Sequence, residues 1–280
     1  MPTQTPPPQG PSLPVSSASP LLSSFTTFLT LSLHSLLYHR ALYPAATFLT
    51  ARALNLPVHQ SRHPGLCAWI NDAVAAVAQQ LQDGAVRRIA VVMHAPPDKK
   101  LAVLERWVFD VESFPTWGQV LLNDDEAAQQ LQEDDEVEDA EGEDDLPPAV
   151  QEKDAVNWID VNEALRGALR RIAYAAESKP PLPEGSTFTL AVELRDEAPA
   201  PIRHPQPWIP SQPNLQPPTK SAPNQGSSLV GSSTTPIRSV QAGPLFFECW
   251  LEQTSIDSSS KMPITPNAKP HLRNRAIRTS

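Results

Sequence analysis

The chain has 280 residues, 32 of them proline, and a formal net charge of -9 at pH 7. Half of the prolines fall in residues 1–20 and 199–223, where little apolar surface is available to offset the entropy cost of ordering the backbone. Thirteen of the 31 acidic residues lie in residues 124–145, and without them 22 basic residues face 18 acidic ones, a net of +4. The composition predicts one folded domain with unstructured attachments. It implies neither an acidic surface broad enough to exclude nucleic acid nor a basic patch that would bind it tightly, so we expect little direct DNA binding.

Cysteine content and hydropathy limit the cellular environment. Cys67 and Cys249 cannot form a disulfide framework, which favours a reducing compartment such as the cytosol or nucleus. The apolar stretch 21–37 follows no positively charged region and contains Ser, Thr and His, so it is typical neither of a signal peptide nor of a membrane span. We therefore expect a soluble protein without direct membrane binding.

The first predicted element is a long helix. Ser19 and Pro20 match an N-cap followed by proline in the first turn, and the helix should end before Pro44 because proline disfavours helical backbone in the residue before it. Apolar residues at helical spacing cover so much of its circumference that the helix should be buried in the middle of the fold.

Two further helices are predicted from apolar periodicity, over residues 66–81 and 161–176. The first of these should stop at the Asp83-Gly84 pair. The stretch before it, which contains Pro57 and Pro64, is interpreted as irregular.

Strands are predicted in the remaining ordered parts. Residues 89–93 form a continuous apolar run, and residues 101–111 should return beside them as a hairpin after a turn at 96–98. Alternation predicts another strand at 187–194, and two late strands are expected at 235–240 and 245–251. This order predicts an α+β domain with three helices packed on one face of a mostly antiparallel sheet.

Motifs of catalysis and cofactor binding are missing from the sequence. With 10 glycines it contains neither glycine-rich nucleotide fingerprint, and no Gly-x-Ser-x-Gly elbow occurs. The acidic run lacks the ligand order of a calcium loop. His59 and His63 have a metal-compatible spacing but lie between prolines in a non-helical stretch, and Cys67 beside His63 leaves a hydrolase as an alternative. We expect no enzyme, no metal and no cofactor.

The end of the first helix carries a recognisable pattern. Residues 38–44 read Tyr-His-Arg-Ala-Leu-Tyr-Pro, which resembles the Tyr-x-Arg-x-x-Tyr-Pro signature of HORMA-domain proteins. The resemblance continues in register over most of the chain expected to be ordered. It covers residues 56–64, 89–93, 104–110, 185–192, 207–209, 235–238 and 247–252.

Two branches of this family are candidates for the chain. The His63-Pro64 pair, the strand at 187–189 and the Pro207-Trp208 pair resemble the branch of accessory subunits of DNA polymerase zeta. The spindle-checkpoint branch, whose members bind mitotic regulators, is the alternative.

The resemblance implies a mechanism and partners. HORMA domains hold a short peptide of a partner by strand addition, and a mobile C-terminal segment then wraps over the peptide like a belt. The implied partners are the catalytic subunit of polymerase zeta, captured through a proline-containing motif, and the scaffold deoxycytidyl transferase of translesion synthesis. A homodimer or heterodimer of HORMA domains and a nuclear location are implied as well.

The resemblance also implies roles for individual residues. Trp69 and Trp208 match aromatic positions of the peptide site, although the helical stripe leaves a core role open for Trp69. Arg166 matches an arginine of the HORMA dimer face, with a solvated surface charge as the alternative. The positions that match the interface with the scaffold polymerase are Thr234, Glu248 and Trp250.

The predicted organisation follows from these assignments. Residues 1–19 form a Pro/Ser-rich tail and residues 254–280 a basic tail. The HORMA domain spans 20–253, with an acidic insertion at 123–150 and a Pro/Ser-rich insertion at 210–232.

Overall fold

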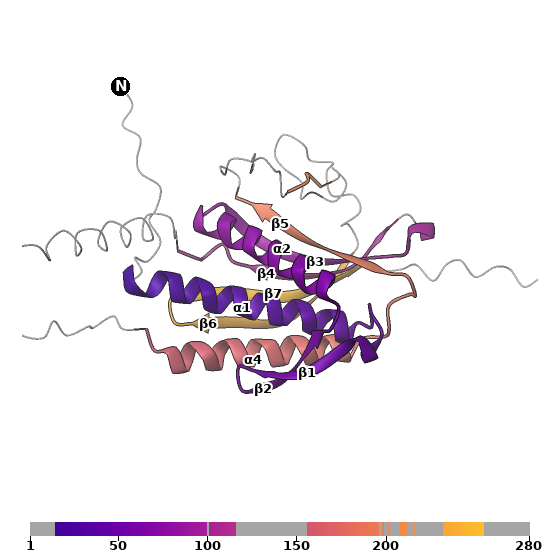
Figure 1. The fold of residues 1–280 in the computed structure, drawn as a ribbon. Coiled ribbons are helices and arrows are strands. Elements are labelled where there is room, and N and C mark those ends of the chain that lie inside the picture. The colour runs from indigo at the N-terminus through magenta and orange to yellow at the C-terminus, as the bar shows by residue number, and fades with distance from the viewer. Residues whose placement is uncertain are drawn as a thin grey trace, which may run out of the picture.

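The computed structural model places a five-stranded antiparallel sheet at the centre of the domain (Figure 1). Its strands lie in the order β5-β3-β4-β7-β6, so β5 and β6 are the two edges. Every neighbouring pair is antiparallel. The strands are β3 (Val86–His94), β4 (Val103–Asp110), β5 (Thr187–Leu194), β6 (Ser232–Ala242) and β7 (Leu245–Thr254).

Part of the chain is described by the structure. The predicted tails at 1–19 and 254–280 lie wholly or largely outside that part, as do the predicted insertions at 123–150 and 210–232. The described residues are 15–99, 101–115, 156–195, 198, 201, 208–211, 216 and 232–254.

Three long helices cover one face of the sheet (Figure 1). They are α1 (Val15–His39), α2 (Pro64–Gln82) and α4 (Trp158–Glu177), and α1 contacts both of the others. The predicted fold class, three helices on a mostly antiparallel sheet, is confirmed. So is the predicted pairing of β3 with β4.

Helix α1 starts earlier than the sequence indicates. The prediction of an N-cap at Ser19 is wrong, because the helix already begins at Val15 and Pro20 lies inside it. Ser19 and Pro20 are both exposed, so the hydrogen bond that proline cannot make lies on the solvent side. By length and composition α1 could cross a membrane, but 61% of its most apolar window is buried inside the fold, as expected for a core helix.

The stretch before α2 is a hairpin. The interpretation of this stretch as irregular is wrong, because β1 (Phe48–Ala53) and β2 (Leu56–Ser61) pair antiparallel. Leu54 and Asn55 form its turn with positive φ angles of 46° and 58°, the backbone of a tight two-residue hairpin. Short 3₁₀ turns at Ala45–Thr47 and Pro97–Lys99 complete the described elements.

The hairpin lies against the end of α1 through ring contacts. The imidazole of His59 stacks on Tyr38, with ring centroids 3.5 Å apart and planes within 14°. His39 meets His59 edge-on at 5.6 Å. Burial lowers the pKa of both histidines, and the neighbouring His59 lowers that of His39 further.

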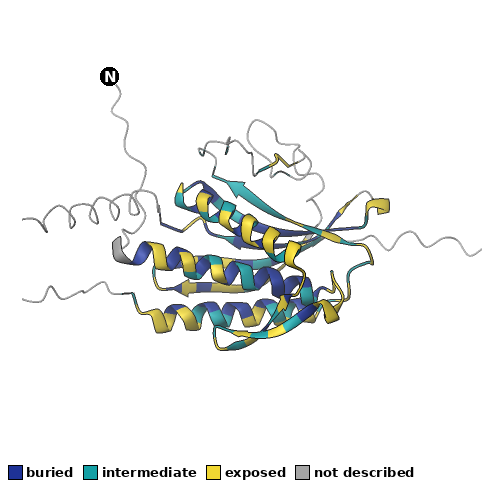
Figure 2. Ribbon diagram, in the orientation of Figure 1, coloured by how far each residue is buried: buried dark blue, intermediate teal, exposed yellow. Residues whose placement is uncertain are grey.

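The main core fills the space between the helices and the sheet (Figure 2). Phe25 and Phe28 of α1 contact Phe247 of β7 at ring-centroid distances of 5.4 and 5.5 Å, which joins the first helix to the last strand. The opposite face of the sheet carries only a small apolar cluster, centred on Ala90 and Val108. The main core therefore lies on the helix side of the sheet.

Candidate functional site

Strand β5 is an edge of the sheet. It pairs with β3 from Val86 opposite Leu194 to His94 opposite Thr187. Among the described residues no strand pairs with its other side. That side is a row of backbone N–H and C=O groups to which an extended peptide can add.

An aromatic pair lies beside this edge. Trp69 of α2 meets Phe188 of β5 edge to face, with ring centroids 5.1 Å apart and planes at 86°. Trp69 is 42% exposed, which excludes the fully buried core role that its helical position had left open. A half-exposed tryptophan against an edge strand is instead available to a partner.

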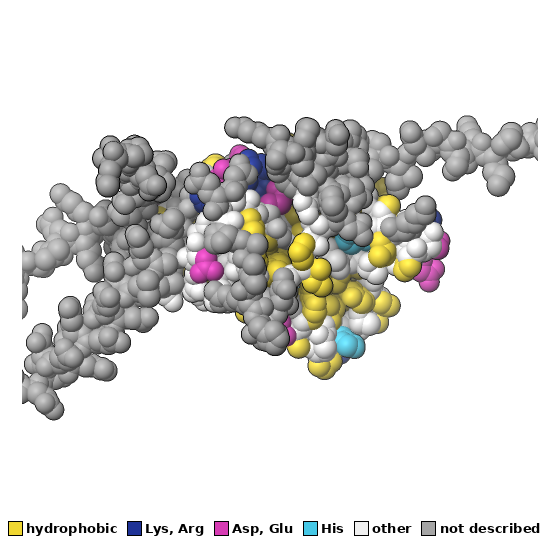
Figure 3. Space-filling model, turned by 90° about the horizontal axis from the view of Figure 1, so that it is seen from above, with side chains coloured by type: hydrophobic (Ala, Val, Ile, Leu, Met, Phe, Trp, Pro, Cys, Tyr) yellow, Lys and Arg dark blue, Asp and Glu magenta, His cyan; other side chains and the backbone are white. Residues whose placement is uncertain are grey.

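Phe188 is the first of three apolar residues that share one face of β5. Phe188, Leu190 and Val192 pack against the main core, yet each is only half buried, and no further strand of the described part of the chain lies beside them. Seen from the side of β5 and α2, hydrophobic side chains gather on the surface (Figure 3). The alternation in the sequence placed these three residues on one face but could not show that the strand is an edge.

The helix next to this edge is almost uncharged. From Pro64 to Gln82, Asp72 is the only charged residue. His63 caps the helix, its Nδ1 accepting a hydrogen bond from the backbone N–H of Leu66 at 3.2 Å. The surroundings of β5 on the helix side therefore favour apolar partner side chains, with affinity drawn from backbone pairing and apolar contact.

The other face of β5 is fixed by His94. Its Nδ1 lies 3.1 Å from the carbonyl oxygen of Leu101 and therefore carries the proton, which leaves Nε2 to accept from the Thr189 hydroxyl at 2.9 Å. Burial lowers the pKa of His94, and the bond to Leu101 opposes that shift in part. The neutral imidazole thus ties β5 to the end of β3.

The chain leaves β5 at a defined place and re-enters the sheet at the opposite edge. Arg195 bonds back to the carbonyl oxygens of Val86 and Glu112 at 3.2 and 2.7 Å, which fixes the exit from β5. The next strand that the structure describes is β6, at the far edge. Between them Trp208 is half buried and packs against the core on the helix side. The connection thus contacts the domain at the position predicted to anchor a belt.

The C-terminal hairpin β6–β7 is held to the rest of the sheet by ion pairs on its outer face. Arg106 of β4 binds Glu193 of β5 and Glu252 of β7, the latter at 2.7 Å. Trp250 donates from Nε1 to Glu252 at 2.8 Å, and the guanidinium of Arg88 lies 5.4 Å from its ring. This network links both halves of the sheet across its outer face.

The three residues predicted to face a scaffold polymerase lie on that same outer face. Glu248 and Trp250 are two residues apart on β7 and therefore share a face with Glu252. Thr234 is the ladder partner of Glu252 and lies on the same face. Thr234 and Glu248 are exposed, and Glu248 accepts a hydrogen bond from Ser239 at 2.9 Å. The fold brings these residues together, although two different strands carry them.

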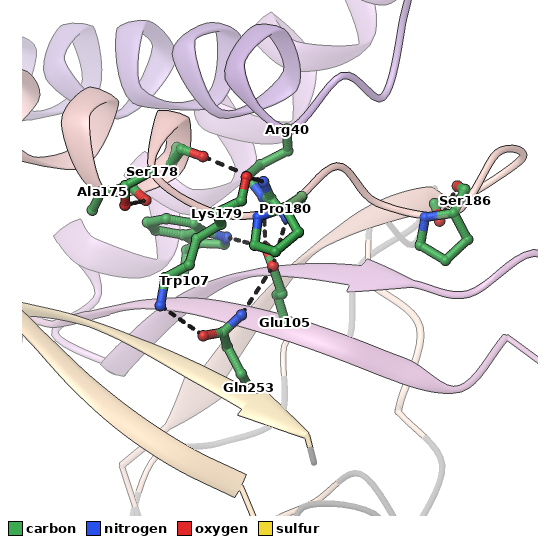
Figure 4. A network of polar contacts seen from close by, with 11 residues as sticks. Arg40, Glu105, Trp107, Ala175, Ser178, Lys179, Pro180, Ser186 and Gln253 are labelled. Carbon is green, nitrogen blue, oxygen red and sulfur yellow. Dashed lines mark hydrogen bonds and ion pairs between the residues drawn. The ribbon is translucent and has the colours of Figure 1, made fainter. Parts of the chain in front are cut away.

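A second network secures the end of β7 from the helix side (Figure 4). Arg40 is 1% exposed and binds both oxygens of Glu105, at 2.9 and 2.8 Å. Arg40 also donates to the carbonyl oxygens of Lys179 and Pro180 beyond α4. Gln253 at the end of β7 reaches the same carboxylate at 3.3 Å.

This network gives the signature in residues 38–44 a physical role. Its arginine joins α1, β4, the end of α4 and the last strand, and Trp107 adds a bond to Glu105 at 3.1 Å. A charge this deeply buried is stable only when its partner and hydrogen bonds are all present. Arg40 therefore stabilises the placement of the C-terminal hairpin.

Arg166 lies apart from both surfaces. It pairs with Glu163 on α4 and lines a hollow of about 290 Å³ between that helix and the turn of the β1–β2 hairpin. Leu54, Asn55 and Asn162 complete the lining. Trp69 thus lies at the β5 edge, Trp208 against the main core, Thr234, Glu248 and Trp250 on the outer face of the hairpin, and Arg166 on α4.

The alternative chemical sites find no support in the geometry. Among the residues that the structure describes, no three His, Cys, Asp or Glu side chains come together as metal ligands. The Cys67 thiol donates to the carbonyl oxygen of Ser61 at 3.1 Å, and His63 is engaged as the cap of α2. These two side chains serve the local structure around the start of the helix.

The order of elements and the sequence match a known family over most of the chain. The profile of the HORMA domain matches residues 22–237. The chain belongs to the HORMA-domain family. The resemblance read from residues 38–44 and the segments that follow is confirmed.

Individual HORMA relatives are similar along nearly their whole length. The DNA polymerase zeta processivity subunit of Schizosaccharomyces pombe is 28% identical over 229 residues, which covers 82% of this chain and 91% of the relative. The subunit of the same name from Arabidopsis thaliana is 22% identical, covering 87% and 91%. The spindle assembly checkpoint protein MAD2A of Dictyostelium discoideum is 25% identical, covering 78% and 86%.

Solved HORMA structures share the fold. A chain of the mitotic checkpoint complex superimposes with a TM-score of 0.56 at 15% identity, covering 83% of this chain and 98% of that chain. Caenorhabditis elegans HTP-2 bound to the HIM-3 closure motif gives 0.54 at 14% identity, covering 91% and 99%. At these identities the likeness establishes the architecture alone.

Proposed function

We propose that this protein is the non-catalytic accessory subunit of DNA polymerase zeta and acts in the nucleus in error-prone translesion synthesis. Its similarity to two polymerase zeta processivity subunits over more than four fifths of the chain supports this function. The observation that carries the mechanism is the open edge of β5 beside Trp69. Such an edge binds a peptide and needs no catalytic group.

The captured segment is a stretch of the catalytic subunit that adds to β5 as a sixth strand. Its backbone pairs with the outer side of β5, and alternate side chains lie over Phe188, Leu190 and Trp69. An apolar, proline-containing segment suits this surface because α2 offers it almost no charge. The connection that carries Trp208 closes over the segment as the belt.

A second surface bridges to the scaffold deoxycytidyl transferase. Thr234, Glu248 and Trp250 share the outer face of the C-terminal hairpin, on the opposite side of the sheet from the helices. A partner bound there does not compete with the peptide at β5. One chain can thus hold two polymerase subunits at once, which is what an adaptor requires. Arg166 on α4 leaves a third surface for a second HORMA domain.

The test is capture of the catalytic subunit by the full chain. Peptides tiled across the catalytic subunit of polymerase zeta are titrated calorimetrically into the wild-type protein. One short segment should bind, and Trp69→Ala should weaken it at least about 10-fold, as loss of an aromatic anchor does. Trp208→Ala should weaken it several-fold. Tyr174→Ala, which removes an aromatic side chain that is 68% exposed on α4, is the matched control and should bind like the wild type.

A second experiment, a pull-down with the full chain, separates the polymerase role from a checkpoint role. Pull-down from nuclear extract should recover the polymerase catalytic subunit, and recovery of mitotic regulators in its place would assign the chain to the checkpoint branch. Equal affinity of the wild type and the Trp69 variant would refute the site at β5 whichever partner is captured.

A further inference from the structure

Strand β6 carries a short motif that the adaptor role does not use. Four Ser or Thr residues in the chain are followed directly by proline, at positions 5, 19, 235 and 265. Only Thr235 also has a cation three residues later, in Thr235-Pro236-Ile237-Arg238. Proline-directed protein kinases accept a hydroxyl followed by proline, and those of the cyclin-dependent class favour a basic residue at the third position beyond it.

We propose that Thr235 is a phosphorylation site for a proline-directed kinase, and that its phosphate is held by cations of α4 and β6. In the reaction the Thr235 hydroxyl oxygen attacks the γ-phosphorus of ATP, and the bond from that phosphorus to the β,γ-bridging oxygen breaks. The hydroxyl proton passes to the base of the kinase and ADP leaves. The phosphorylation site lies away from the peptide-binding edge, so this proposal does not depend on the peptide site at β5.

Thr235 is accessible and lies in a weakly held part of the sheet. It is exposed, although its ladder partner Leu251 is fully buried, because β6 is an edge strand. The register with β7 shifts between Pro236 and Arg238, and Pro236 has no N–H to contribute. The first residues of an edge strand that contains a bulge and a proline open with little cost, which lets a kinase bind the segment in extended form.

Cations flank Thr235 on the helix side of the sheet. The guanidinium of Arg238 lies over Gly167 of α4, so close that a Cβ there would be 3.0 Å from Nη1. The ammonium of Lys179 donates to Gln253 at 2.8 Å, and Gln253 stands opposite Ser233 in the ladder. Thr235 lies between these two points along β6.

A third cation follows from helical geometry. Arg171 is exposed and lies four residues after Gly167, hence on the same side of α4, one turn closer to the end of the helix at which Lys179 lies. A phosphothreonine carries a charge of about -1.5 to -2 and three acceptor oxygens, and opposite such a cluster it forms new charge-assisted hydrogen bonds. The modification should therefore fasten β6 to α4.

The experiment uses the full chain, an active cyclin-dependent kinase, ATP and magnesium, with the modified residue located by mass spectrometry. Phosphate is expected at Thr235 and should disappear in Thr235→Val, which keeps a β-branched residue in the strand. Thr234→Val is the matched control and should be modified like the wild type, because no proline follows position 234. Arg238→Gln should slow the reaction at Thr235 several-fold.

A second readout tests the cation cluster. The phosphorylated wild-type chain should unfold about 2–4 °C higher than the unmodified chain, the size of shift that one added charge-assisted contact gives a domain of this length. The double variant Arg171→Gln, Lys179→Gln should lose most of that increase. Phosphate confined to positions other than 235 overturns the site, and an unfolding temperature that stays constant or falls on modification overturns the role of the cations.

Discussion

The two edges of the sheet differ in almost every property. Strand β6 is polar along most of its length, contains Pro236 and is bulged beside it. Strand β5 contains no proline, and its residues Phe188, Leu190 and Val192 expose part of their apolar surface next to Trp69. Polar side chains, proline and bulges are the devices by which proteins keep an edge from pairing with other chains.

The difference between the two edges favours β5 as the edge that pairs with a partner strand. An open apolar edge invites aggregation, so a soluble domain keeps one only where a partner covers it. The polar side chains, the proline and the bulge of β6 discourage pairing with another chain, while its neighbour β7 is held in place through Gln253 and Glu252. Edge β5 is the edge at which we propose that the partner peptide binds. One protected edge and one apolar edge are what we expect of an adaptor that binds a partner by strand addition.

The largest expected effect comes from removing what holds the β6 side in place. Glu105→Ala leaves the guanidinium of Arg40 buried without its carboxylate, and the free energy of unfolding should fall by about 3–5 kcal/mol. Chemical denaturation measures this. Glu105→Gln, which keeps an acceptor for Trp107, should cost less. Equal stability of Glu105→Ala and the wild type would show that the network does not carry the hairpin.

The next prediction concerns the β5 edge itself. Leu190→Glu places a charge in the apolar row and should weaken binding of the captured peptide by about 30-fold, since the carboxylate must be desolvated under the added strand. Gln241→Glu makes the matched change on β6 and should leave affinity unchanged. Thermal unfolding first shows that both variants are folded. Calorimetry then compares their affinities for the peptide with that of the wild type. If both variants weaken binding equally, the two edges are equivalent and the assignment to β5 fails.

A smaller effect is expected from the network that joins the two edges. Arg106→Gln leaves Glu193 of β5 and Glu252 of β7 without their shared cation. Because these groups are partly exposed, the expected loss of stability is about 1–2 kcal/mol, below that of the buried pair. Denaturation at low and high salt should show the wild type losing this contribution as salt rises. If the unfolding free energy of Arg106→Gln depends on salt as strongly as that of the wild type, the salt dependence comes from other charges.

The smallest expected effect is the part of the pH dependence of stability that His94 contributes at the β5 side. Burial lowers the pKa of His94 below 6.5, so the unfolded chain binds the proton more readily than the folded one. Stability from this group is complete above pH 6.5 and is lost as the pH falls through that value toward the folded pKa. His94→Gln should flatten the slope of stability between pH 7.5 and 5.5. The slope that remains comes from His34, His39 and His59, whose pKa values burial also lowers.

Local patterns predicted most elements and little of their arrangement. The apolar periodicity of α2 and α4 and the alternation in β5 were sufficient because each reflects one face turned to a core. The β1–β2 hairpin was missed because its turn, Leu54-Asn55, lacks the glycine that usually marks such turns, and because Pro57 suggested irregular chain. Pro57 is tolerated because it lies near the end of a two-stranded hairpin.

The candidate site shows the same division. The resemblance indicated Trp69, but its partner Phe188 was not recognised, since nothing local distinguishes an edge strand from a central one. Thr234, Glu248 and Trp250 were predicted as a group, and the antiparallel register places them on one face. Their roles toward partners, and that of Arg166, stay predictions.

By itself the sequence determined most of the helices and strands, the burial of the first helix and the membership in the HORMA-domain family, because these depend on the spacing of residue types along the chain. Only the tertiary structure decided that β5 and β6 are the two edges, that Arg40 reaches Glu105, and that the last strands return beside β4. These facts depend on contacts between residues 65 to 148 positions apart. No local pattern encodes such contacts, because the packing of the whole core sets them.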